Sequence, residues 1–449
     1  MNTTCFSYRP ARVGGRLVAA LLFTGLQLSL VLFPFGSMRA GENEERNAFT
    51  WKNLQSDIAG VADRTDPNLV NSWGLTINTT AKVFWIADNA AGVSTLYRPD
   101  GSPVLLPSPL PQNFVTLPGT LVDTSAEPPT PAAPTGIVFN PSSSSPNSNI
   151  FLIPGTKSPA IFIFDGEDGG IWAWNPAFSL LNGFLVIQPP TDDPTKNSVY
   201  KGLALANRQS GGPTLYATNF RNGTIDVFDS SFNLVTTFSD PNPPPVPAGT
   251  PSPGWAPFGI ATIDNLLYVT FALQNVGNPP SVLPKHDDVA GVGHGFVDVF
   301  SPDTGFVKRL IEFSGNGPLN SPWGLARVPH EFGNFDHDVL LVGNFGDGNI
   351  NAFGIRNGTF RGTLLHRTGQ PLEFNGLWSL FFSDDHLYFT AGIADEAHGL
   401  FGVIRAQGEQ EEEGDNGGQR VVKAIRAMTR TREDKGARRR PRLVRYLDP

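Results

Sequence analysis

The sequence predicts an all-β fold, a six-bladed β-propeller of four-stranded antiparallel blades. A short phrase, in which a glycine precedes a large apolar residue, recurs six times at intervals of roughly 50 to 70 residues, the length of one such sheet with its loops. Strand-like segments and turns follow each phrase, and 48 Gly and 40 Pro suit many tight connections. The six phrases are Trp73-Gly74-Leu75, Thr135-Gly136-Ile137, Lys201-Gly202-Leu203, Phe258-Gly259-Ile260, Trp323-Gly324-Leu325 and Asn375-Gly376-Leu377.

Four strands are expected in each repeat. The phrase opens the first strand, and an apolar run predicts the second, for example at residues 84–88 and, in the second repeat, at residues 150–153. An alternating stretch such as residues 224–229 predicts a half-buried third strand. A turn such as Pro99-Asp100-Gly101 then leads into a short fourth strand. Six such sheets placed radially cover one another's apolar faces, which a single sheet cannot do.

The ring is predicted to close with the N-terminal strand. The last repeat shows three clear strands and ends near Arg405, whereas residues 49–58 form an unassigned strand ahead of the first repeat. We therefore expect this strand to pair beside residues 400–404 as the outer strand of the sixth blade. The propeller then spans residues 49–404.

Residues 1–40 predict a targeting segment. Arg9, Arg12 and Arg16 precede an apolar run over residues 17–35, a pattern typical of a secretory signal peptide, with cleavage expected near Ala40. The run approaches the roughly 20 residues of a membrane span, so an uncleaved signal anchor is the alternative. Cys5, the single cysteine, lies in this segment, and cysteine usage therefore says nothing about export. The protein is expected to be secreted, or membrane-anchored if the segment stays attached.

Charge restricts the partners. The formal net charge is −8, which argues against a nucleic-acid partner. Residues 405–449 form an acidic and then strongly basic extension, expected to be a disordered tail. Contact of this tail with an acidic polysaccharide or a membrane surface is the alternative.

Loops and turns carry the candidate surface features. Long connections at residues 107–134, 188–200, 240–256 and 272–295 all belong to the propeller face that bears the blade-to-blade connections. Elaborated loops on a rigid ring are a usual place for binding, although Pro-rich loops also merely span blades. Asn78, Asn222 and Asn357 start triplets that match the N-glycosylation acceptor pattern, and all three fall in predicted turns.

Polar residues that end the predicted second strands are candidates for a metal site. Asp88, Asn89, Asn219 and Asn344 would approach the central channel, and their oxygens suit Ca²⁺. The same residues are favoured in hairpin turns, where Asn and Asp side chains bond their own backbone. Both readings stay open at this point.

Two histidine-containing segments are candidates for ligand binding. His286, Asp287, Asp288 and His294 lie in the long excursion of the fourth repeat, where imidazole and carboxylate suit a transition metal or acid–base chemistry. Glu396 and His398 lie in a loop of the last repeat. A solvated polar loop is the alternative for both.

Common catalytic signatures are missing from the sequence. It contains no His-Glu-x-x-His motif, no Gly-x-Ser-x-Gly motif and no phosphate-binding glycine loop ending in Lys-Ser or Lys-Thr. Whether the protein is an enzyme is therefore left open.

Several stretches of the sequence carry a resemblance to a known family. They are Asp66-Pro67-Asn68-Leu69-Val70-Asn71-Ser72-Trp73-Gly74-Leu75, His286-Asp287-Asp288-Val289-Ala290-Gly291, Ser321-Pro322-Trp323-Gly324-Leu325, Leu341-Val342-Gly343-Asn344-Phe345-Gly346-Asp347-Gly348 and Glu396-Ala397-His398-Gly399-Leu400-Phe401-Gly402. These stretches resemble an uncharacterised secreted β-propeller family of bacteria and plants, related to NHL-type repeat propellers. The resemblance implies the propeller fold and export, but no reaction and no catalytic residues. The extension after Arg405 departs from the pattern.

Two functional hypotheses follow from the sequence. The first is an exported binding or scaffold propeller that presents its loop-rich face to an extracellular glycan or protein. The second is a Ca²⁺-assisted hydrolase of lactones or esters that uses the central channel.

Overall fold

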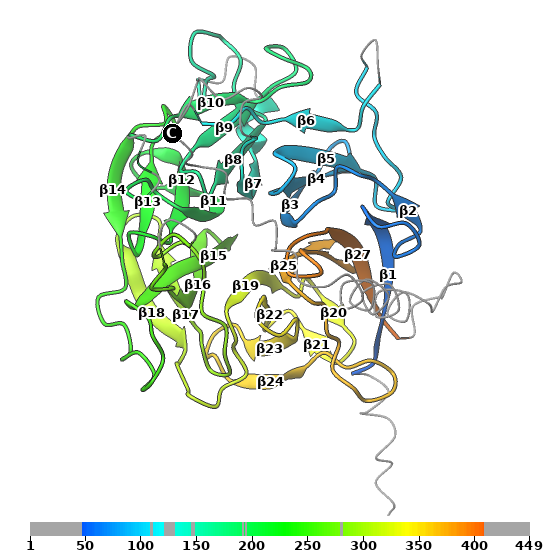
Figure 1. Cartoon of the computed structure of the whole chain (residues 1–449), viewed down its shortest axis with the longest axis vertical. Helices are drawn as coiled ribbons and strands as arrows, with labels where there is room; N and C mark the ends of the chain where they lie inside the picture. Colours follow the sequence, from blue (N-terminus) through cyan, green and yellow to red (C-terminus); the bar gives the residue numbers. More distant parts are fainter. Residues whose placement is uncertain are drawn as a thin grey trace, which may run out of the picture. The chain divides into compact units, whose positions relative to one another are not determined.

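The computed structural model describes residues 47–107, 111–120, 131–144, 149–190, 193, 195–278 and 282–407. Within these residues six sheets surround a common axis, which confirms the six-bladed propeller (Figure 1). The blades, each with its innermost strand first, are β3 (Ser72–Asn78), β4 (Val83–Asp88), β5 (Val93–Tyr97) and β6 (Phe114–Thr116); β7 (Pro134–Phe139), β8 (Phe162–Gly166), β9 (Ile171–Trp174) and β10 (Phe184–Ile187); β11 (Tyr200–Arg208), β12 (Gly212–Asn219), β13 (Thr224–Phe228) and β14 (Leu234–Phe238); β15 (Trp255–Ile263), β16 (Leu266–Leu273), β17 (Phe296–Ser301) and β18 (Gly305–Ile311); β19 (Pro322–Arg327), β22 (Val339–Asn344), β23 (Ile350–Gly354) and β24 (Phe360–Thr363); and β25 (Leu377–Ser383), β26 (His386–Ala391), β27 (Leu400–Ala406) and β1 (Phe49–Ser56).

The predicted closure of the ring is confirmed. β1 runs antiparallel to β27, with Thr50 opposite Arg405 and Ser56 opposite Leu400, and the short β2 (Arg64–Thr65) extends the same sheet. Figure 1 shows the blue β1 next to the orange β27. Asp57 fixes the end of this seam, because its carboxylate accepts hydrogen bonds from the Gly399 N–H at 2.9 Å and contacts His398 Nδ1 at 2.6 Å.

The repeated glycine allows neighbouring innermost strands to approach each other. A Cβ atom on Gly74 would lie 2.5 Å from the Thr135 carbonyl oxygen of the next blade, and one on Gly324 would lie 2.6 Å from the Trp378 carbonyl oxygen. Real Cβ atoms do not come this close to backbone. The phrase that recurs in the sequence therefore marks the contact of one blade with the next.

The register of the last repeat differs from the prediction. Leu380 pairs with Phe389 as Leu75 pairs with Ile86 in the first blade. Ser379 therefore takes the place of the repeated glycine, three residues beyond Gly376. The pair Gly376-Leu377 lies by chance at about the expected repeat spacing. It was therefore assigned the position that Ser379 occupies.

The second strand of the second blade was also predicted wrongly. This strand is β8 at Phe162–Gly166, whereas residues 150–153 belong to the connection between β7 and β8. Phe151 and Ile153 are fully buried against residues of the third blade, and the Phe151 N–H donates to the Ser230 carbonyl at 2.7 Å. A loop that is buried by the neighbouring blade has the same apolar pattern as an inner strand.

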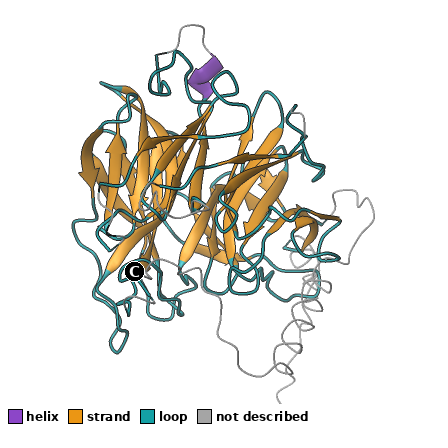
Figure 2. Cartoon of the chain, turned by 45° about the horizontal axis from the view of Figure 1, so that its top comes forward, coloured by secondary structure: helices purple, strands orange, loops and turns teal. Residues whose placement is uncertain are grey.

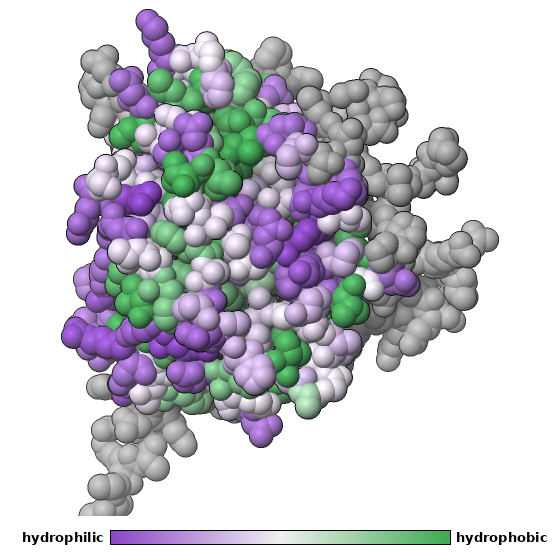
Figure 3. All heavy atoms as spheres, turned by 90° about the vertical axis from the view of Figure 1, so that its left-hand side faces the viewer, coloured by the Kyte–Doolittle hydropathy of each residue, from purple (hydrophilic) through white to green (hydrophobic). Residues whose placement is uncertain are grey.

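Aromatic and aliphatic side chains fill the space between blades. Between the first two blades, Trp85 stacks on Phe162 with ring centroids 4.1 Å apart, and Trp174 packs on both. Burying a side chain of this size contributes about 1.5–3 kcal/mol. The outer rim around β14 and β18 mixes polar and apolar residues, as Figure 3 shows, and includes the exposed Leu234 and Val307.

The remaining described elements are small. A 3-10 helix at Pro141–Ser144 follows β7 at one end of the strands (Figure 2), and a hairpin of β20 (Glu331–Phe332) and β21 (Phe335–Asp336) follows β19. Within the described ranges, no helix has the length and apolar character needed to cross a membrane. The predicted targeting segment with Cys5 and nearly all of the predicted charged tail lie outside the described residues.

Candidate functional site

One backbone arrangement recurs in all six blades at the end of the ring's axis that we call the channel mouth. The residue that directly follows the second strand donates its N–H to the carbonyl of the residue that precedes the first strand, at 2.8–3.0 Å. This pairing brings six equivalent residues to the same end of the ring. They are Asn89, Glu167, Phe220, Gln274, Phe345 and Gly392.

A second set of equivalent residues lies on the innermost strands. Each precedes the repeated glycine or, in the last blade, Ser379. They are Trp73, Thr135, Lys201, Phe258, Trp323 and Trp378. The aromatic members pack together around the axis, with Trp73 and Trp378 stacked at a centroid distance of 3.4 Å. Lys201 is the single charged residue in this set.

Lys201 forms a buried ion pair with Glu167 of the preceding blade. The two side chains are 3% and 14% exposed, and Lys201 Nζ also lies 5.1 Å from the Trp73 ring centroid and 5.8 Å from that of Phe220. Burial lowers the pKa of Lys201, but the charges of Glu167 and Asp287 outweigh it and raise the pKa overall. Burial likewise raises the pKa of Glu167, but Lys201 and His286 hold it below its usual value. Both groups are therefore ionised.

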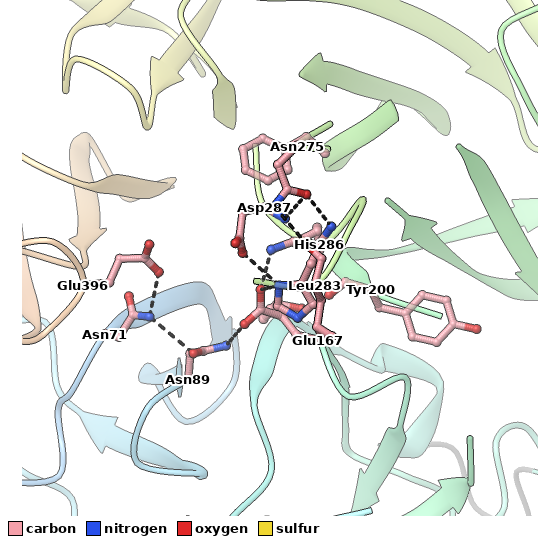
Figure 4. A network of polar contacts seen from close by, with 12 residues as sticks. Asn71, Asn89, Glu167, Tyr200, Asn275, Leu283, His286, Asp287 and Glu396 are labelled. Atoms are coloured by element: carbon pink, nitrogen blue, oxygen red, sulfur yellow. Dashed lines mark hydrogen bonds and ion pairs between the residues drawn. The ribbon is translucent and has the colours of Figure 1, made fainter. Parts of the chain in front are cut away.

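The excursion of the fourth blade brings an imidazole and a carboxylate to this ion pair. Asn275 shapes the excursion, because its side chain accepts the His286 N–H at 2.9 Å and donates to the Leu283 carbonyl at 3.0 Å. His286 Nδ1 then lies 2.8 Å from Asp287 Oδ1 and 4.0 Å from Glu167 Oε1. Figure 4 shows these side chains meeting at the centre, while Tyr200 points away.

A line of amide groups connects Glu167 to Glu396 in the last blade. Asn89 Nδ2 donates to Glu167 Oε2 at 3.0 Å, and Asn71 Nδ2 donates to both Asn89 Oδ1 at 3.3 Å and Glu396 Oε2 at 3.0 Å (Figure 4). Burial, reinforced by the charge of Glu167, raises the pKa of Glu396 to about 7. Trp378 Nε1 donates to Asn71 Oδ1 at 3.3 Å and so ties the line to the aromatic cluster.

The site contains more acidic groups than cations. Glu167, Asp287, Asp288 and Glu396 all interact electrostatically with Lys201, and burial raises the pKa of Asp288 against the opposing effects of Ser321 and Lys201. Burial lowers the pKa of Arg221, the other nearby cation, to about 10, so it stays charged. Such a site favours a cation or a ligand rich in hydrogen-bond donors.

Five of the residues singled out in the sequence meet at this site. They are Asn89, His286, Asp287, Asp288 and Glu396. They come from the first, fourth and sixth blades, and Glu167 and Lys201 add the second and third, so that five blades contribute side chains to the site. We call these five residues, together with Asn71, Glu167 and Lys201, the channel-mouth cluster.

The other three candidates for a calcium site bond within their own blades. Asp88 accepts from Ser72 Oγ at 2.8 Å and from Thr95 Oγ1 at 2.7 Å. Asn219 donates to Asp226 and Asn344 to Asp347, each in its own hairpin. The contacts of Asn219 and Asn344 lie within hairpins, and those of Asp88 join the two strands beside its own.

Two histidine candidates have structural neighbours elsewhere. His294 Nδ1 lies 2.8 Å from the Val289 carbonyl oxygen of its own loop. His398 contacts Asp57 at the seam. Of the glycosylation candidates, Asn222 and Asn357 are exposed, and Asn78 is half-buried at the end of β3.

Sequence reasoning missed Glu167, Lys201 and Asn71. Glu167 follows β8, which the misplaced second strand concealed. Lys201 stands in the repeated phrase, where the aromatic residues of other repeats could have marked its position as facing the axis. Asn71 was noted only as part of a resembling stretch.

The fold and this site together define a six-bladed propeller with a charged channel mouth above an aromatic core. No protein-family model matches the chain. The chain belongs to the same family as two uncharacterized proteins of Acanthamoeba polyphaga mimivirus. It is 32% identical to protein R648 over 379 residues, covering 83% of this chain and 82% of the relative, and 31% identical to protein L690 over 380 residues, covering 83% and 88%.

Solved structures with a similar arrangement share little sequence with this protein. A glucose dehydrogenase matches with a TM-score of 0.45 and 14% identity, covering 80% of this chain and 100% of that one. A luciferin-regenerating enzyme matches with a TM-score of 0.45 and 12% identity, covering 82% and 99%. Likeness at this level carries no argument about activity.

Proposed function

We propose that the protein is an exported binding propeller whose channel mouth, with the loops around it, holds a polar part of an extracellular glycan or protein. The observation that supports this proposal is the channel-mouth cluster, to which side chains from five of the six blades contribute. A network that draws on five blades is held rigidly by the ring, which lowers the entropy cost of ligand binding.

The chemistry of the cluster fits a ligand that donates hydrogen bonds. Carboxylates of Glu396, Asp287 and Asp288 and the amide of Asn71 offer acceptors suited to hydroxyl or ammonium groups. Trp73 and Trp378 below them are 1% exposed, so they support the cluster and offer no free stacking surface. Specificity is therefore expected to come from hydrogen bonds rather than from ring stacking.

A binding screen with a matched variant tests this proposal. The purified protein is applied to a glycan array and to a pull-down from extracellular material, beside Glu396→Gln and the control His337→Gln, whose side chain is 60% exposed and outside the cluster. We expect the wild type and the control to retain a ligand that Glu396→Gln binds more weakly. If Glu396→Gln retains the ligand as well as the wild type does, the ligand binds elsewhere on the protein.

Export is part of the proposal and is tested separately. The basic and apolar pattern of residues 1–40 supports a signal peptide, or an anchor if it is not cleaved. The exposed Asn222 and Asn357 support glycosylation in a host that modifies secreted proteins. Expression in such a host, N-terminal sequencing and glycosidase treatment would show cleavage near Ala40 and a mass shift. An unprocessed chain retained inside the cell would contradict export.

A second candidate function is metal-assisted hydrolysis of a lactone or ester. The observation that favours it is the proximity of one ligand atom each from Glu167, His286 and Asp287, all within 4.8 Å of one another. A bound cation there would polarise a carbonyl group. The test is hydrolysis of model lactones and esters that is lost with a chelator and restored by Ca²⁺ or another divalent ion.

A further inference from the structure

The ligand atoms of Glu167, His286 and Asp287 are arranged around a common point. His286 and Asp287 are consecutive residues of the fourth blade, held by Asn275, and Glu167 reaches them from the second blade. A tetrahedral ion with bonds of about 2.0–2.2 Å places its ligands about 3.3–3.6 Å apart. From separations of up to 4.8 Å, movements of about 1 Å would complete such a site.

The three ligand side chains differ in exposure. The His286 and Asp287 side chains are 23% and 49% exposed, whereas Glu167 is held by Lys201 and Asn89. Small rotations of the two partly exposed side chains toward Glu167 would close the site. Three protein ligands leave a position for water or substrate.

The ligand chemistry selects the ion. One imidazole with two carboxylates suits a divalent transition metal, whereas Ca²⁺ takes about six to eight oxygen ligands and Mg²⁺ keeps most of its water. The calcium site expected from the sequence used Asp88, Asn89, Asn219 and Asn344, and three of these residues hydrogen-bond within their own blades.

Lys201 holds a positive charge beside the same carboxylate. Its ammonium group donates to Glu167, so an incoming ion has to share or replace that contact. The rings of Trp73 and Phe220 and the carboxyl group of Asp288 give the ammonium group other favourable neighbours. The lysine therefore weakens metal binding without preventing it.

We propose that Glu167, His286 and Asp287 bind one divalent transition-metal ion, with Zn²⁺ as the reference ion, and that Lys201 competes with the ion for Glu167. This inference goes beyond the proposed binding function and deepens the second candidate, whose cation it identifies, and the ion binds whether or not a glycan, protein or ester does.

Calorimetric titration of the chelator-treated protein with ZnCl₂ and with CaCl₂ tests the proposal. We expect one Zn²⁺ per chain and Ca²⁺ binding at least about tenfold weaker. Glu167→Gln and His286→Gln should each weaken Zn²⁺ binding by about tenfold or more, and His337→Gln should leave it unchanged. Lys201→Met should tighten Zn²⁺ binding, which damage to the fold would not do.

The outcomes separate clearly. Absence of Zn²⁺ binding by the wild type, or Zn²⁺ affinity that is the same in Glu167→Gln and His286→Gln, overturns the metal site. Unchanged or weaker Zn²⁺ binding by a folded Lys201→Met overturns the competition. If Glu167→Gln or Lys201→Met does not fold, as judged by circular dichroism, the partly exposed His286→Gln still decides the ligand set. Because no glycan or ester is present, failure here leaves the proposed binding function standing and removes only the cation on which the second candidate depends.

Discussion

The channel mouth shows two different uses of one backbone position. In the first two blades the residue after the second strand is Asn89 or Glu167, which hydrogen-bond to each other. In the third and fifth blades the same position holds Phe220 and Phe345, which join the aromatic cluster around the axis. The backbone hydrogen bond is the same in all four blades. The ring thus fixes where this side chain points. The residue type alone decides whether the part of the channel mouth contributed by one blade, here called a sector, is charged or apolar.

The largest expected effect comes from making the charged sector apolar on one side only. Lys201→Met leaves the buried carboxylate of Glu167 without its cation, and we expect a loss of about 3–5 kcal/mol in the free energy of unfolding. The double variant Glu167→Leu/Lys201→Met should recover most of this loss, because it converts the sector to the aliphatic type. Urea unfolding measures both. A double variant as unstable as Lys201→Met would show that this sector requires charge.

The reverse exchange places the amide of the first blade in the third. Phe220→Asn removes a fully buried ring and leaves a buried amide without designed partners, so we expect a loss of about 3 kcal/mol. Thermal unfolding of Phe220→Asn and the wild type measures this loss in the free energy of unfolding. A loss below about 1 kcal/mol would mean that the two sectors are interchangeable.

A buried acid away from the channel sharpens the comparison through pH. Burial raises the pKa of Asp298 to about 7, against the hydrogen bond and charge of Arg309, whereas Glu167 stays ionised beside Lys201. The folded chain then keeps a proton that the unfolded chain releases near pH 4, so stability should fall as pH rises from about 4 to about 7. Asp298→Asn should flatten this fall by about 2 kcal/mol. Denaturation curves of the wild type and Asp298→Asn at pH 5 and pH 8 test this prediction. An equal loss of unfolding free energy in the two proteins between these pH values would contradict it.

The smallest effect is expected for the amide that bridges the two acidic groups. Asn89→Ala removes its hydrogen bonds to Glu167 and Asn71 but leaves the backbone unchanged, so we expect a loss of about 1 kcal/mol. Chemical denaturation measures it. A loss as large as that of Lys201→Met would make the amide line, and not the ion pair, the support of the sector.

The ring and its closure were predictable because they depend on repeated local signals. Glycine before an apolar strand marks a blade contact, as Gly74 shows, and an unpaired strand at residues 49–58 had one open edge to join. The repetition itself supplied the evidence. Five residues of the channel-mouth cluster were also recognisable, because polar groups such as Asn89 follow the end of a strand and His286 lies in a long loop.

The rest of the cluster depends on register, which the sequence shows less clearly. Residues 150–153 are apolar because the third blade buries them, so they were taken for the strand that precedes Glu167. Lys201 is polar at a position that is aromatic in four other blades, and only its partner across the blade boundary explains it. Contacts between blades connect residues far apart in sequence, and no local pattern encodes them.

The seam has a consequence for how the chain is made. β1 is the first described strand to be synthesised, yet its neighbour β27 is the last. Until Leu400–Ala406 has left the ribosome, the edge of β1 that faces β27 has no native partner and the sixth sheet is open. A nascent chain therefore cannot complete the sixth sheet before residues 400–406 are synthesised, however early the other sheets form.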